Sequence, residues 1–189
     1  ARSDAPMHPL IAGLAQAWAE LGEGRMSEAL ETLDRVAAVD GMEPFANYCR
    51  AISLALVGDI EGALAVIEAP DAGVAAGLNR RGYIAYAQLL GLSERFDDAL
   101  ALIDTVFIGN ADPGVEAMRR AYEAGEALPF DVVASPAEGM AEVFSVMAGA
   151  MSNAQNPIEA LIYAQAAVLV NPRLTDSQLM IGQIFEQLE

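Results

Sequence analysis

The chain contains no lysine and, among its 189 residues, only one histidine, one cysteine and one tryptophan. A lone cysteine, Cys49, excludes an internal disulfide framework. A lone histidine, His8, provides no pair of imidazoles for a zinc site, and we interpret it as part of a terminal lead-in rather than as a catalytic base. No apolar run approaches the ~20 residues that a membrane-spanning helix needs. The sequence therefore predicts neither a metal site nor insertion into a membrane.

Positive charge is also scarce. The ten basic residues are all arginines and stand against 27 acidic residues, which gives a net charge of −17. Such an acidic surface repels phosphate backbones and anionic lipids. We therefore expect no nucleic-acid partner, and we interpret the acidic residues as solvated helix faces that keep an apolar chain in solution.

Groups that could carry out a reaction are few. Gly22-Glu23-Gly24 lacks the preceding strand and the Gly-Lys-Ser ending of a phosphate-binding loop. Paired acids such as Asp97-Asp98 matter for hydrolysis only where a cleft holds them ~5–10 Å apart. We therefore expect that the chain is not an enzyme and has no catalytic residue, cofactor or metal.

What the chain does have is a repeated seven-residue stretch. It occurs as Gly24-Arg25-Met26-Ser27-Glu28-Ala29-Leu30, and again, ending in Ala-Leu each time, at residues 58–64, 94–100 and 155–161. We call the alanines of these Ala-Leu endings the marker alanines: Ala29, Ala63, Ala99 and Ala160. Successive marker alanines lie 34, 36 and 61 residues apart. A period in the thirties is the signature of a helical repeat array. Apolar residues at three- and four-residue steps around these stretches predict amphipathic helices.

These patterns predict an all-α fold, an α-solenoid of antiparallel helix pairs with about ten helices. Residues 1–9 are expected to be a flexible lead-in and residues 10–189 the array. The expected pairs cover residues 10–40, 44–69, 79–108 and 136–171, and an unpaired last helix follows at 174–188. Residues 113–135 are expected to hold an atypical helix and an ordered loop that tucks Phe130 and Val133 against its neighbours.

The first pair departs from the repeat, and two registers are conceivable. In the other pairs, a small residue lies twelve positions before the marker alanine and a large apolar residue lies nine positions before it. With the same turn length, the first pair would have Ala17 at the small position and Glu20 at the large apolar position, which is unfavourable for a charge. A turn two residues longer places Ala15 and Trp18 there instead. We prefer the longer turn, which makes Trp18 a core residue.

A small residue lies twelve positions before the marker alanine in three pairs, and a large apolar residue follows it by three. These residues are Ala51 with Leu54, Ala87 with Leu90, and Ala148 with Met151. Small side chains let two antiparallel helices approach closely. Together with the closing Asn171-Pro172, the pattern resembles the tetratricopeptide repeat (TPR) family. The order of features is similar to the middle segment of large multi-TPR proteins of alphaproteobacteria.

The resemblance implies a TPR-like superhelix, a fragment of a longer bacterial protein, that acts as a non-catalytic protein–protein interaction scaffold. Its partner would be a protein or peptide. The family likeness implies export to the periplasm, with the cytoplasm as the alternative. The partner groove would carry Tyr48, Ile52, Arg81, Ile84 and Gln88.

Two further expectations concern particular regions. As an alternative function, a helical sensor module would bind a small acidic ligand or peptide near Arg81 and the 127–136 loop, because guanidinium groups bind carboxylates. The last helix would expose Leu179, Ile181 and Phe185 without a second helix to cover them. Because an uncapped terminal repeat tends to associate, we expect self-association through this helix.

Overall fold

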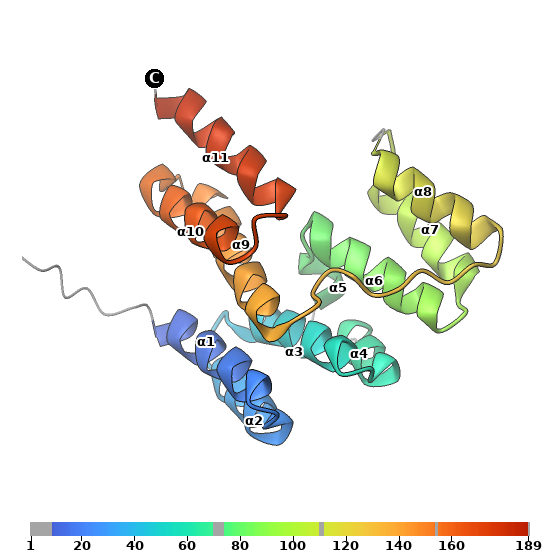
Figure 1. Ribbon diagram of the computed structural model, residues 1–189, viewed down its shortest axis with the longest axis horizontal. Helices are drawn as coiled ribbons and strands as arrows, with labels where there is room; N and C mark the ends of the chain where they lie inside the picture. Colours follow the sequence, from blue (N-terminus) through green and yellow to red (C-terminus); the bar gives the residue numbers. More distant parts are fainter. Residues whose placement is uncertain (1–8, 70–73, 110–111, 154, 189) are drawn as a thin grey trace, which may run out of the picture. The chain divides into compact units, whose positions relative to one another are not determined.

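The computed structural model describes residues 9–69, 74–109, 112–153 and 155–188, and all regular structure in these ranges is helical (Figure 1). The helices are α1 (Pro9–Gly22), α2 (Met26–Ala37), α3 (Glu43–Leu56), α4 (Ile60–Ile67), the one-turn α5 (Val74–Gly77), α6 (Arg80–Leu92), α7 (Phe96–Val106), α8 (Pro113–Glu123), α9 (Pro136–Asn153), α10 (Pro157–Val170) and α11 (Thr175–Leu188). The prediction of an all-α fold is confirmed. Residues 1–8 of the expected lead-in, His8 among them, lie outside the described residues, whereas Pro9 begins α1.

Five of these helices end in the same turn. In each turn one residue adopts the left-handed conformation, with φ between 58° and 88°; these residues are Gly24, Gly58, Glu94, Gly125 and Gln155. After α3, for example, the Gly58 N–H donates to Ala55 O at 3.0 Å and the Asp59 N–H donates to Leu54 O at 2.9 Å. This pair of bonds defines the Schellman motif. The repeated stretches of the sequence therefore contain copies of one helix-ending turn.

The shared turn determines the register of the first pair. We aligned the five copies on their left-handed residues, in chain order. Seven positions earlier the copies have Ala17, Ala51, Ala87, Met118 and Ala148. Four positions earlier they have Glu20, Leu54, Leu90, Ala121 and Met151. Glu20 therefore does occupy a position held by a large apolar residue in three of the other copies. Our preference for a longer turn was wrong, because hydrogen bonds compensate the buried carboxylate. Trp18 is nonetheless buried.

Residues 37–134 form one compact unit. In it α3 packs against α4, α6 against α7 and α7 against α8, and α4 also contacts α6. The core of the unit combines alanines with large apolar residues: Ala51, Ala55, Ala63, Leu64, Ile67, Ala87, Leu89, Leu90, Ala99, Ile103, Phe107, Val115, Met118 and Tyr122. The alanines let neighbouring helices approach, and the large side chains fill the space beside them.

Tyr122 connects α8 to α6 inside this core. Its hydroxyl donates to Ala87 O at 3.0 Å. Its ring lies against Gly91, where an added Cβ would come within 2.5 Å of the ring, so a larger residue would force the helices apart. Burial raises the pKa of Tyr122 to about 12, with a smaller contribution from the charge of Asp131.

No helix follows the turn at the end of α8. In the other copies the second helix begins two residues after the left-handed residue, at Met26, Ile60, Phe96 and Pro157. The corresponding residue here is Ala127, and Pro129 follows shortly after. A proline restricts the residue before it to extended conformations, so Leu128 does not continue a helix. Residues 127–134, which we call the strap, instead run as non-helical chain along α6 (Figure 1).

Residues 9–36 and 135–188 belong to a second compact unit, in which α1 packs against α9, α9 against α10, and α10 against α11. The contact of α1 with α9 was not predicted, because a regular repeat array places only neighbouring repeats in contact. Ser135 caps α9 by accepting a hydrogen bond from the Glu138 N–H at 3.2 Å. Among the described residues, no helix has the length and apolarity that crossing a bilayer requires.

Candidate functional site

The five residues predicted to line a partner groove lie on α3 and α6. Tyr48 and Ile52 on α3 are buried, Ile52 completely. On α6, Gln88 is buried, whereas Arg81 and Ile84 are partly exposed. We refer to Arg81, Ile84 and Gln88 as the α6 face, because positions 81, 84 and 88 follow the three- and four-residue steps of one helix side.

Gln88 uses both ends of its side-chain amide to hold Asp131 of the strap. Its Nε2 donates to Asp131 Oδ1 at 2.6 Å, and its Oε1 accepts from the Asp131 backbone N–H at 3.2 Å. Only 4% of Gln88 is exposed. A buried amide requires such partners, since an unsatisfied polar group costs free energy when it leaves water.

Arg81 binds the next residue of the strap. Its guanidinium donates to the backbone carbonyl of Val132 at 2.8 Å. Arg81 lies two turns before Gln88 on α6, while its partner Val132 follows Asp131, so the strap runs antiparallel to the helix. The bonds from Arg81 to the Val132 carbonyl and from the Asp131 N–H to Gln88 engage main-chain atoms of the strap.

Apolar contacts complete the attachment of the strap. Leu128 and Phe130 pack against the core cluster of residues 37–134, and Val132 and Val133 are buried. We predicted Arg81 and Gln88 as groove residues and placed Arg81 near the 127–136 loop, but we did not identify Asp131 and Val132 of that loop as their partners. A signal was available, because Pro129 marks the one copy of the repeat whose second helix cannot form.

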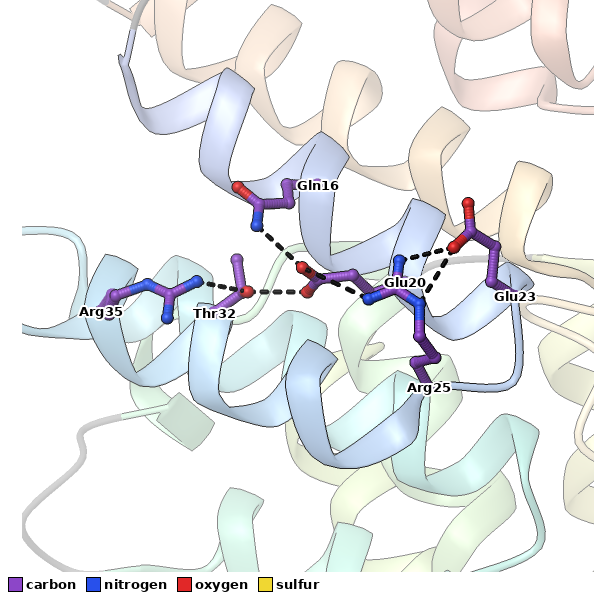
Figure 2. Close-up of polar contacts among 6 residues, drawn as sticks. All are labelled: Gln16, Glu20, Glu23, Arg25, Thr32 and Arg35. Carbon is purple, nitrogen blue, oxygen red and sulfur yellow. Dashed lines mark hydrogen bonds and ion pairs between the residues drawn. The ribbon is translucent and has the colours of Figure 1, made fainter.

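A second polar cluster joins α1 to α2 (Figure 2). The Glu20 carboxylate accepts hydrogen bonds from Gln16 Nε2 and from Thr32 Oγ1, each at 2.7 Å, and Arg35 donates to Thr32 Oγ1 at 2.8 Å. Arg25, in the turn, approaches Glu20 at 3.9 Å. The bonds from Thr32 and Gln16 hold the pKa of Glu20 below its ordinary value. A carboxylate kept ionised in this way is suited to joining two helices rather than to transferring protons.

A shallow pocket of about 320 Å³ lies between α1 and α9. It is lined by Ala15, Trp18, Ala19 and Gly22 of α1 and by Pro136, Ala137 and Met140 of α9. The indole N–H of Trp18 is buried and has no hydrogen-bond partner among the described residues. The lining is apolar, so this pocket offers packing contacts.

Two other arginines contact the protein's own acids. Arg80 pairs with Asp112, and Arg119 pairs with Asp104 and Glu116. In the part of the chain that the structure describes, no three His, Cys, Asp or Glu side chains gather as a metal site would require. Comparison with known proteins adds no relative: no family model, no curated protein and no solved structure matches this chain.

Proposed function

We propose that this chain is an interaction scaffold of the TPR type, without catalytic activity, which binds a protein or peptide through the faces of its helix repeats. The observation that carries the proposal is the binding of the strap. Side chains of the α6 face hold a stretch of non-helical chain through its main-chain atoms and an aspartate. The α6 face of this protein thus already binds another piece of polypeptide, which supports the proposal.

The repeated turns support the same function. Schellman turns connect α1 to α2, α3 to α4, α6 to α7 and α9 to α10. Such repetition builds extended surfaces from similar units, which is how repeat proteins bind their partners. Arg81 donates to a backbone carbonyl of the strap, a group that every polypeptide offers, and this favours the scaffold over a sensor that binds a small acidic ligand beside Arg81.

The test begins with affinity capture on the immobilised chain from a bacterial lysate. Each captured protein is then purified and titrated against the chain by isothermal calorimetry. Hydrogen exchange of the complex maps the bound surface. We expect saturable binding and slower amide exchange on α3 and α6, which carry Tyr48, Ile52, Arg81, Ile84 and Gln88.

Two results would contradict the proposal. If no captured protein binds saturably, the chain is not an interaction scaffold of the kind proposed. If a protein binds saturably but the exchange of α3 and α6 is unchanged, the scaffold uses another surface and the predicted groove is wrong. Buried Tyr48 and Ile52 are unsuitable for mutation in this test, because charged residues at their positions would unfold the helices.

A further inference from the structure

We propose that the α6 face is a receptor for an extended peptide and that the strap is its occupant in cis. A partner segment with the same chemistry would then bind by exchange with the strap. The chemistry is that of an aspartate between apolar residues, as in Phe130-Asp131-Val132. This inference rests on the proposed function and specifies the kind of partner.

The internal repeats support this role of the α6 face. In four copies of the repeat, the helix that ends in the Schellman turn is followed directly by a second helix. After α8 the strap follows the same turn, and it returns to α6 rather than forming a helix. The segment that follows the Schellman turn is therefore a helix in four copies and an extended chain, the strap, in the fifth.

The α6 face recognises mainly groups that an extended peptide offers. Arg81 binds a carbonyl and Gln88 binds a backbone N–H, and both groups are present in any peptide. The hydrogen bond from Gln88 to the Asp131 carboxylate depends on the residue type, as does the packing of Leu128 and Phe130. Recognition of an extended chain commonly combines main-chain hydrogen bonds for affinity with side-chain contacts for specificity.

The strap and a free peptide compete for the α6 face. The strap is tethered to α8 at one end and to α9 at the other. Short tethers give effective concentrations on the order of millimolar, so a free peptide competes poorly while the strap is intact. Weakening the strap without changing the α6 face should therefore strengthen the binding of the free peptide.

The experiment uses a fluorescein-labelled peptide of residues 126–135, Glu-Ala-Leu-Pro-Phe-Asp-Val-Val-Ala-Ser, and fluorescence anisotropy. The full chain is compared with Asp131→Ala, which weakens the strap, and with Asp131→Ala/Gln88→Ala, which also damages the receptor. We expect the peptide to bind Asp131→Ala roughly tenfold more tightly than the unmodified chain, because the strap loses a hydrogen bond to a charged group. We expect the gain to be lost in the double variant and with a peptide whose aspartate is replaced by alanine.

A second measurement avoids variants that fail to fold. Excess unlabelled peptide is added to the unmodified chain, and amide exchange is followed at residues 130–133. Exchange should accelerate, because peptide on the α6 face displaces the strap. Unchanged exchange at millimolar peptide, or binding to Asp131→Ala that is insensitive to Gln88→Ala, would overturn the exchange model. If a captured protein still binds saturably over α3 and α6 in that case, the proposed function stands and only this inference fails.

Discussion

The indole ring of Trp18 on α1 lies so close to Gly139 on α9 that a Cβ at residue 139 would come within 2.2 Å of the ring. Two helices far apart in the sequence therefore meet where the largest side-chain type faces the smallest. Close packing of this kind is sensitive to the addition of a single methyl group.

We accordingly predict that Gly139→Ala destabilises the unit that contains α1 and α9. Overpacking in a tight core typically costs about 1–3 kcal/mol. Urea unfolding followed by the fluorescence of Trp18, the only tryptophan, measures the change. Gly149→Ala is a matched control on the same helix, because its added Cβ meets no atom within 4 Å. Alanine should stabilise there by up to about 1 kcal/mol, and equal effects of the two variants would contradict the packing argument.

The repeated turn predicts stabilising substitutions. Glu94 and Gln155 adopt left-handed conformations, each with φ 58°, that glycine adopts at the equivalent Gly58. Because a side chain is unfavourable in this conformation, we expect Glu94→Gly and Gln155→Gly each to stabilise the protein by about 1 kcal/mol. Gly58→Ala should destabilise it by a similar amount. Thermal unfolding would refute the prediction if both glycine variants melted below the unmodified chain.

Glu20 should make stability depend on pH in the acidic range. Because its pKa is lower in the folded state than in the unfolded chain, its contribution is fully present above its ordinary pKa and is lost as the pH falls through the folded-state pKa. We expect Glu20→Gln to lose stability near pH 7 and to differ less from the unmodified chain as the solution is acidified. Denaturation midpoints between pH 2 and pH 7 test this, and a difference that does not depend on pH would contradict it.

The exposed side of α11 should promote self-association. Phe185 is 50% exposed and Leu179 is 60% exposed, and covering a large apolar side chain contributes roughly 1.5–3 kcal/mol. We expect sedimentation of the unmodified chain to depend on concentration and Phe185→Glu to remain monomeric. Gln183→Glu adds the same charge at an exposed polar site of the same helix and should still associate. A monomer at all concentrations would show that this prediction is wrong.

The helices could be predicted because the repeat imposes the same local pattern several times. A small residue, a left-handed turn and a marker alanine recur at fixed offsets, as in Ala51, Gly58 and Ala63. Each copy therefore supports the interpretation of the others. Apolar residues spaced over one or two turns are enough to identify a segment as an α-helix.

The contacts between distant segments could not be predicted in the same way. The pairing of Gln88 with Asp131 and the packing of Trp18 on Gly139 join residues far apart in the sequence, and no periodicity relates them. The register of the first pair was misjudged for a different reason. A charge was judged unfit for the position of Glu20, whereas Thr32 and Gln16 supply the hydrogen bonds that make it fit.

The packing of α1 on α9 has a consequence for synthesis on the ribosome. Gly139 follows Trp18 by 121 residues, and translation proceeds at about 5–20 residues per second. About 6–24 s therefore pass between the synthesis of Trp18 and the synthesis of the α9 residues that pack on it. During that interval α1 and α2 can pair with each other, but the largest apolar side chain of the pair stays available to chaperones and to neighbouring nascent chains.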